Sequence, residues 1–201
     1  YFLWEHLLAS LQRIALGVLG GIAVGVVVGI AKALIPEQGR QLEPYQNFLR
    51  ALPPLGYIGL QNVWFGIGDT SKIWLLFLAA FPPIAMATID GVRGIRTDRI
   101  LAAQSMGASP VGVLRYVILP ASLPSIVSGV RIATGFAWTT VVAAELNNGI
   151  PGIGGLAYLS GTQLQTPLTI ACIIVIGLAA IALDAAIKRL GAFLVPWQGK
   201  A

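Results

Sequence analysis

The chain has 201 residues, of which 56% are hydrophobic and 10% are charged. Soluble domains are usually about 45–50% apolar and about 25% charged, so this composition excludes an ordinary soluble domain and indicates a membrane protein. The net charge of +5 comes from basic residues scattered between apolar segments, which argues against nucleic-acid binding. One cysteine, Cys172, is too few for an internal disulfide or a cysteine-based metal site.

Five segments come close to the roughly 20 apolar residues that a helix needs to cross a bilayer. They predict an all-α, polytopic helical bundle in which residues 1–201 form a single transmembrane domain. The expected spans cover residues 11–35, 45–67, 72–89, 120–146 and 167–190.

The first expected span carries four glycines at a strict spacing of four residues: Gly17, Gly21, Gly25 and Gly29. This spacing places them on one face of a helix, where small residues let another helix approach closely. We therefore expect a helix-packing face, rather than the general glycine enrichment of membrane helices.

Proline pairs interrupt the second and third expected spans, at Pro53-Pro54 and Pro82-Pro83. Each pair removes helical hydrogen bonds and is expected to kink or break its helix. Such breaks at membrane depth suit a transporter or channel better than a passive anchor.

Basic residues predict the orientation, because cytoplasmic loops collect Lys and Arg. One group lies between the third and fourth spans and another follows the fifth: Arg93, Arg96, Arg99 and Arg115, then Lys188, Arg189 and Lys200. The Asp69–Lys72 turn and the connection 147–165 are then expected outside. Five spans leave Tyr1 outside, so both ends in the cytoplasm would require a sixth helix upstream.

The cytoplasmic segment 97–116 is expected to form two short helices. Thr97 is a candidate N-cap of the first, and Gly107 is expected to end it. Ser109 and Pro110 suit the start of the second, which we expect to end at Leu119-Pro120. The small side chains favour insertion into a groove on a partner; an interfacial helix resting on lipid headgroups is the alternative.

This segment resembles a motif of the binding-protein-dependent ABC importer permeases (the type I class). The motif is Glu-Ala-Ala, three residues, Gly, nine residues, Ile, one residue, Leu-Pro. Here Ala102-Ala103, Gly107 and Leu119-Pro120 keep that spacing, while Leu101 replaces the glutamate and Val117 the isoleucine. Because Leu101 is apolar, any docking contact there is expected to be apolar.

The resemblance extends along nearly the whole chain, including "LRALPPLGYIGLQNVWFGIGDTSKI" and "ILPASLPSIVSGVRIATGFAWTTVVAAEL". It points to the group that imports taurine, alkanesulfonates, nitrate or bicarbonate, and within it to taurine import. It implies a bacterial inner-membrane permease that works as a homodimer with two ATPase subunits and a periplasmic substrate-binding protein. ATP and Mg would be bound by the ATPase, so this chain would hold no cofactor and no catalytic site.

The resemblance assigns the ATPase contact to a run of ten residues in the cytoplasmic segment. They are Leu101, Ala102, Ala103, Gln104, Ser105, Met106, Gly107, Ala108, Ser109 and Pro110.

Polar residues within the spans are candidates for the lining of the translocation path, because intramembrane polar groups usually face protein or water. They are Gln61, Asn62, Trp138, Thr139, Thr140, Glu145 and Asn147. Gln61 and Asn62 could instead bond between helices, and Glu145 could lie at the membrane surface beside an Asn-Gly helix end.

Two further charged or ionisable residues have structural interpretations. Arg131 is expected to pair with Asp184, with an anionic substrate as the alternative partner. His6 is the only histidine, so no metal site is assigned to it.

The sequence argues against two other function classes. An ion-coupled secondary transporter would normally show inverted repeats or a chain of buried carboxylates, and neither is visible in the sequence. An intramembrane enzyme would need a nucleophile paired with a base, and no such pair is evident.

Overall fold

The computed structural model describes residues 2–35, 44–45, 47–48, 51–146 and 151–197. Every regular element in this part of the chain is helical. In chain order these are α1 (Leu3–Leu34), the 3₁₀-helix η1 (Pro54–Tyr57), α3 (Ile58–Phe65), α4 (Asp69–Arg93), α5 (Thr97–Ser105), α6 (Pro110–Val113), the π-helical turn η2 (Leu114–Ile118), α7 (Leu119–Glu145), α8 (Ile153–Thr162) and α9 (Thr166–Leu194).

Four helical segments of the described chain are long and apolar enough to cross a membrane: α1, α4, the continuous stretch Pro110–Glu145, and α9. They match four of the five expected spans. The expected span 45–67 is not one long helix, because its described residues after 53 form only η1 and α3. Pro53 and Pro54 lack backbone N–H groups, and Gly66, with φ of 74°, ends α3.

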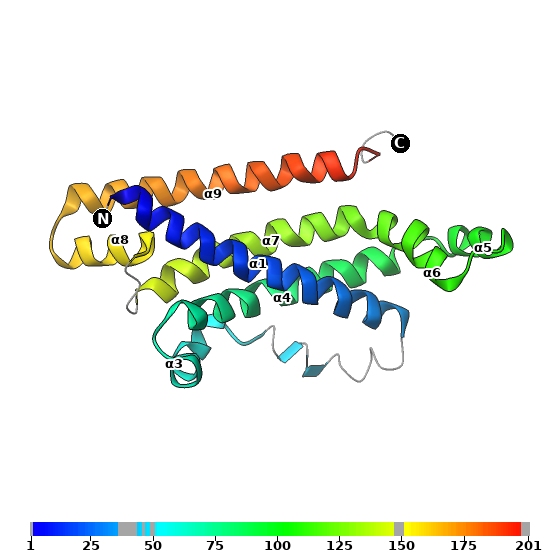
Figure 1. Cartoon of the computed structure of the whole chain (residues 1–201), viewed down its shortest axis with the longest axis horizontal. Helices are drawn as coiled ribbons and strands as arrows, with labels where there is room; N and C mark the ends of the chain where they lie inside the picture. Colours follow the sequence, from blue (N-terminus) through cyan, green and yellow to red (C-terminus); the bar gives the residue numbers. More distant parts are fainter. Residues whose placement is uncertain (1, 36–43, 46, 49–50, 147–150, 198–201) are drawn as a thin grey trace.

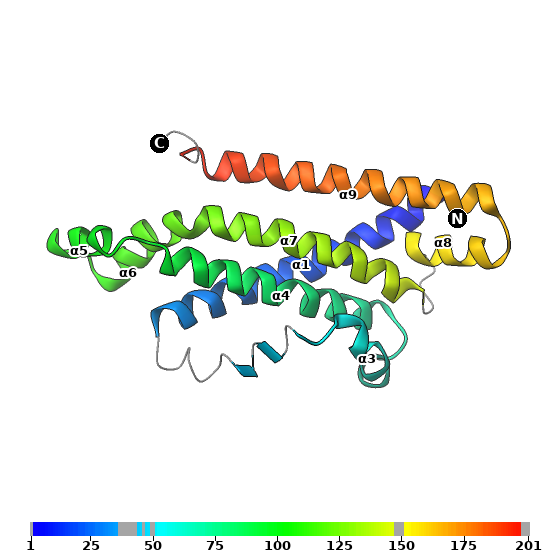
Figure 2. The same ribbon diagram turned by 180° about the vertical axis from the view of Figure 1, so that it is seen from behind.

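The long helices lie roughly along one axis, with α1 crossing α4 and α7 and with α9 beside α7 (Figures 1 and 2). Helices α5 and α6 project at the end of the bundle where α9 also ends (Figures 1 and 2). Helix α8 and the start of α1 lie at the opposite end (Figure 1). Arg93, Arg96 and Arg99 therefore share an end with Lys188 and Arg189, and the positive-inside rule assigns that end to the cytoplasm.

Helices α1 and α4 meet along the predicted glycine face. A Cβ atom added to Gly17 would lie 2.4 Å from Leu76 Cβ, and one added to Gly21 would lie 2.9 Å from Ala80 Cβ. Gly25 and Gly29 meet the next residues in the same register, Ile84 and Thr88. The packing interpretation of the four glycines is therefore confirmed.

The prolines break the helices less than expected. The prediction for Pro82-Pro83 is a kink or a break, and helix α4 continues through both prolines, so a break does not occur there. The prediction that Leu119-Pro120 ends the second cytoplasmic helix is wrong, because α6 runs through η2 into α7. In η2 the Leu119 N–H donates to the Leu114 carbonyl, one residue beyond the α-helical partner, and this wider turn precedes Pro120.

Two apolar clusters hold the chain together. The larger one joins α1, α4, α7, α8 and α9 around side chains such as Leu76, Trp138 and Ile153. The smaller one lies at the cytoplasmic end and contains Ala103 and Val113. The two short cytoplasmic helices are therefore fixed to the bundle by a small core of their own.

Candidate functional site

The first cytoplasmic helix ends in a Schellman motif. The Ala108 N–H donates to the Ala103 carbonyl (3.0 Å) and the Gly107 N–H to the Gln104 carbonyl (2.9 Å). Gly107 has φ of 85°, a left-handed conformation that favours glycine. The predicted end of this helix at Gly107 is confirmed.

The second cytoplasmic helix begins where the sequence predicts. The Gly112 N–H donates to Ser109 Oγ (3.2 Å), and Pro110 is the first helical residue. The predicted cap at Thr97 is wrong by one residue, because α5 starts at Thr97 and the cap position is Arg96, whose side chain makes no capping bond.

Nine of the ten residues assigned to the ATPase contact are exposed, and only Ala103 is buried. Four large apolar side chains of this region face solvent in the isolated chain: Leu101, Met106, Val111 and Tyr116. Met106 is 82% exposed. The small Ala103 lets α5 sit on the cytoplasmic core, while the apolar exposed side chains leave a surface that a partner could cover.

A buried polar cluster occupies the opposite, outer end of the bundle. At its centre is the carboxylate of Glu145, whose side chain has no exposed surface. Arg13 Nη1 donates to Glu145 Oε1 (2.6 Å), Ser10 Oγ donates to the same oxygen (2.7 Å), and the Gly154 N–H donates to Oε2 (2.9 Å). Every contact to this carboxylate is thus a donor, as a buried anion requires.

Arg13 also bonds a second carboxylate at the start of α4. Its Nη2 lies 2.7 Å from Asp69 Oδ1 and its Nε donates to the same oxygen (2.9 Å). Lys72 Nζ lies 3.9 Å from that oxygen. The outer ends of α1, α4 and α7 are therefore joined by alternating charges.

Two further side chains of α1 hold the N-terminal end of α8. The Ile153 N–H donates to Ser10 Oγ (3.0 Å), and the Gly152 N–H donates to His6 Nδ1 (3.0 Å). Because the Gly154 N–H donates to Glu145, the cluster accepts hydrogen bonds from three successive backbone N–H groups. These N–H groups have no partner within the helix, so α1 and α7 supply their acceptors.

The expected path residues of α7 do not share one face. Trp138 and Thr140 are buried, whereas Thr139 is exposed. Thr140 Oγ1 donates to the Phe136 carbonyl (2.7 Å) and Thr139 Oγ1 to the Gly135 carbonyl (3.3 Å). Consecutive helical residues point about 100° apart, so the three side chains cannot line one surface together.

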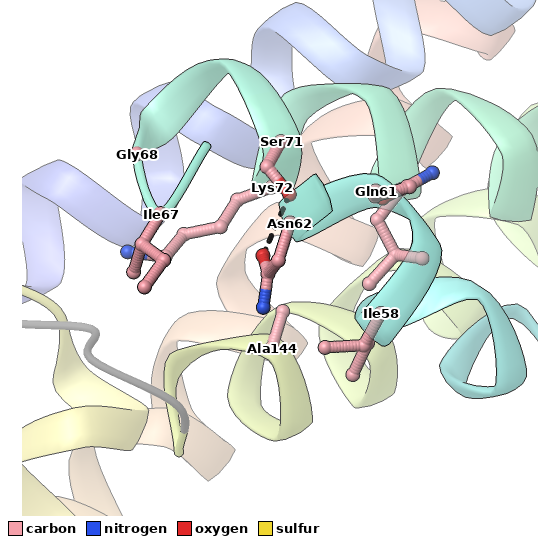
Figure 3. Close-up of a pocket in the computed structure, with 9 residues that line it drawn as sticks. Ile58, Gln61, Asn62, Ile67, Gly68, Ser71, Lys72 and Ala144 are labelled. Atoms are coloured by element: carbon pink, nitrogen blue, oxygen red, sulfur yellow. Dashed lines mark hydrogen bonds between the residues drawn. The ribbon is translucent and has the colours of Figure 1, made fainter. Parts of the chain in front are cut away.

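Gln61 and Asn62 line a small cavity between α3, α4 and Ala144 of α7 (Figure 3). Ser71 Oγ donates to Asn62 Oδ1 (3.1 Å), an interhelical bond drawn as a dashed line in Figure 3. Gln61 is buried, and no donor among the described residues reaches its Oε1. Glu145 follows Ala144, but its side chain is bonded to α1 and α8. Asn147 lies outside the described residues.

The expected pairing of Arg131 with Asp184 is confirmed. Arg131 Nε donates to Asp184 Oδ1 and Nη2 to Oδ2, both at 2.9 Å. This two-point pair joins α7 to α9.

Sequence reasoning missed His6, Ser10 and Arg13 as partners of the outer cluster. The first span was expected to start at residue 11, whereas α1 begins at Leu3. A signal was present, since these residues recur every three or four positions and so share one helical face. Within the described residues, no group of three or more His, Cys, Asp or Glu side chains could hold a metal ion.

The chain is similar to a known protein family and to several known proteins. Residues 17–200 match the family described as "Binding-protein-dependent transport system inner membrane component". The chain is 44% identical to the taurine transport system permease protein TauC of Escherichia coli, over 98% of this chain and 72% of that protein. It is 38% identical to the putative aliphatic sulfonates transport permease protein SsuC of Escherichia coli, over 98% of this chain and 74% of that protein.

A nitrate import permease protein, NrtB of Synechococcus elongatus, is 33% identical over 94% of this chain and 69% of its own length. Among solved structures, a chain of the MetNI methionine ABC transporter in an inward-facing conformation aligns with a TM-score of 0.82. That alignment covers 96% of this chain and 95% of the other at 22% identity, so the likeness concerns the fold.

Proposed function

The chain belongs to the binding-protein-dependent inner-membrane component family, and we propose that it forms the translocation path for a small anionic or zwitterionic solute, namely taurine. Members of this family are non-catalytic permease subunits of ABC importers in the inner membrane, and ATP hydrolysis belongs to the partner ATPase. The proposal therefore concerns the solute, the assembly and the coupling surface.

The observation that carries the solute assignment is the 44% identity to a taurine permease across 98% of the chain. Identity to an aliphatic sulfonate permease is 38% and to a nitrate permease 33%. Alkanesulfonate, nitrate and bicarbonate are therefore the alternative solutes. Taurine differs from nitrate and bicarbonate in carrying an ammonium group as well as an oxyanion.

The assembly in this proposal contains two copies of the chain, two ATPase subunits that bind ATP and Mg, and a periplasmic substrate-binding protein. The exposed side chains of α9 support a second copy. Large apolar residues cover several faces of this helix, including Ile173, Leu178 and Ile181. Lipid and a neighbouring permease can divide these faces between them.

The surface around α5 and α6 is the proposed contact with the ATPase. Its support is the exposed apolar set at the cytoplasmic end, together with the motif spacing from Ala102 to Pro120. Because Leu101 and Met106 are exposed and uncharged, we propose an apolar docking contact. Helix α6 continues into α7, so movement of the contact would reach the membrane span directly.

The solute is tested by uptake into proteoliposomes that contain the permease, its ATPase and its binding protein. Radiolabelled taurine should accumulate in an ATP-dependent manner, and excess unlabelled taurine should suppress uptake more than equal concentrations of ethanesulfonate, nitrate or bicarbonate. Absence of ATP-dependent taurine accumulation, or stronger suppression by nitrate or bicarbonate than by unlabelled taurine, would overturn the assignment.

The docking surface is tested with Met106→Asp and the matched apolar variant Met106→Leu. A buried unpaired charge at an interface costs several kcal/mol, so Met106→Asp should reduce co-purification of the ATPase and uptake by about tenfold or more. Met106→Leu should retain both. Equal ATPase recovery from the two variants would show that Met106 does not lie in the contact.

A further inference from the structure

The outer polar cluster joins α1, α4, α7 and α8 at the end of the bundle opposite the cytoplasmic coupling surface. Its central carboxylate, Glu145, contacts Arg13 and Ser10 of α1 and the Gly154 N–H of α8. We propose that Glu145 is a positioning residue for transport, which holds α8 against α1 and α7 at the outer end of the path. The inference depends on the chain being a permease and not on which solute it carries.

Hydrogen bonds at the start of α8 depend on the carboxylate of Glu145. Glu145 itself accepts from the Gly154 N–H, and Ser10, which donates to Glu145, accepts from the Ile153 N–H (3.0 Å). Two backbone donors at the start of α8 are thus bound directly or through one hydroxyl. An anion at a helix N-terminus also interacts favourably with the helix dipole.

Helix α8 also packs closely against α7 at the same point. A Cβ atom added to Gly154 would lie 2.8 Å from both Cα and O of Val142 on α7. The backbone of α8 therefore rests directly on the backbone of α7, and the Gly154–Glu145 hydrogen bond depends on this approach. Any outward movement of α8 would lengthen that hydrogen bond.

The C-terminal end of α8 is bound to α9. The Gln165 N–H donates to the Ser160 carbonyl (2.8 Å), and Ser160 Oγ lies 2.9 Å from Thr169 Oγ1 of α9. Helix α8 is therefore tied to α9 at its C-terminal end and to the cluster at its N-terminal end. The bonds at its N-terminal end therefore determine whether α8 moves together with α1, α4 and α7 or together with α9.

Removal of the charge at Glu145 should release α8 without unfolding the bundle. Glu145→Gln keeps the size of the side chain and one acceptor oxygen, but it removes the ionic attraction to Arg13. Arg13 keeps its second carboxylate, Asp69, so no cation is left without a counter-charge. The expected change is a larger local opening of α8.

The experiment uses a cysteine reporter on α8 in the complete transporter, reconstituted in lipid nanodiscs. Ala157→Cys places the reporter on the partly buried face of α8, which packs against the main core. A second reporter, Ile118→Cys, lies in the small cytoplasmic core, where Ile118 is buried and is not among the ten residues assigned to the ATPase contact. Labelling by a charged maleimide is followed for both, and the protein without an introduced cysteine gives the background from Cys172.

With Glu145→Gln, we expect the Ala157→Cys reporter to be labelled about tenfold faster and the Ile118→Cys reporter at an unchanged rate. Uptake should fall, while ATP hydrolysis without binding protein should persist. The matched control is Asp184→Asn, which removes a different interhelical ion pair and should leave labelling on α8 unchanged.

Two results would overturn the proposal. One is an unchanged labelling rate at Ala157→Cys in the Glu145→Gln protein. The other is equal acceleration at both reporters, which would show a general loss of structure. If Glu145→Gln does not accumulate, Gly154→Ala decides the matter, because it pushes α8 from Val142 and leaves both charges in place. It should accelerate labelling at Ala157→Cys alone, and failure to do so would also overturn the proposal.

Discussion

The two ends of this permease use charge in opposite ways. At the outer end, Arg13 and Glu145 form an ion pair whose side chains are 5% and 0% exposed. At the cytoplasmic end, Arg96 and Asp98 form a pair whose side chains are 74% and 59% exposed. Water screens the second pair and not the first, so only the outer pair should govern how helices are held.

Large apolar side chains are exposed at both ends, but the apolar cores that hold the two ends differ in size. Around α5 and α6, Met106 and Tyr116 face solvent, and a small core around Ala103 suffices to fix the helices. At the outer end, Ile153 is fully buried beside the polar cluster. The outer end is therefore held by buried polar bonds in addition to the main core, while the cytoplasmic helices are held by a small apolar core alone.

The largest effect is expected from Arg13→Gln. It leaves the Glu145 carboxylate buried without its cation, which should cost about 3–5 kcal/mol of stability. Thermal unfolding of the purified protein should show a strongly lowered Tm. The double variant Arg13→Gln with Glu145→Gln should recover a large part of the loss. A small loss in the single variant would contradict the difference between the two ends.

A smaller effect is expected from Ala103→Leu in the cytoplasmic core. The larger side chain would overfill a site that packs against Val113 and Ile118, at a cost of about 1–3 kcal/mol. Because this core is small, the protection of α5 amides from hydrogen exchange should fall while that of α8 stays unchanged. Loss of protection in α8 as well would mean that the two ends are not independent.

The N-cap of α6 should contribute less. Ser109→Ala removes the acceptor for the Gly112 N–H, which should cost about 1 kcal/mol. Faster exchange at Gly112, with Tm almost unchanged, is the expected result. Ser109→Asp, which keeps an acceptor, is the matched control and should exchange at the parent rate.

The smallest effect is expected from Asp98→Asn. The exposed pair with Arg96 should contribute between about 0 and 1 kcal/mol, and raising the salt concentration should weaken it further. Tm measured at low and high salt should differ little between parent and variant. A loss comparable to that of Arg13→Gln would remove the distinction between buried and exposed pairs.

Much of the fold follows from local patterns that a single sequence displays. The glycines of α1, the Gly107 end, the Ser109 cap and the four spans all depend on neighbours close in the chain. The Arg131–Asp184 pair could also be predicted, because few charged residues lie in the spans and a charge at membrane depth needs a counter-charge.

Other features depend on contacts between distant segments. Glu145 lies 132 residues from Arg13, and nothing local shows that α1 extends outward to meet it. The predicted kink or break at Pro82-Pro83 is not a break for a related reason, since packing against α1 and α7 keeps the helix continuous although each proline removes a hydrogen bond. The burial of Trp138 and Thr140 likewise depends on how α7 is rotated against its neighbouring helices, which a single sequence does not show.

The unbroken helix from Pro110 to Glu145 gives the two ends a direct mechanical connection. Its 36 residues extend for about 54 Å, against a hydrocarbon core of about 30 Å. A tilt of about 5° over that length displaces one tip by about 5 Å relative to the other. The continuous stretch of α6, η2 and α7 is thus long enough that a small rotation beside Ser109 would displace the Glu145 carboxylate at its far tip.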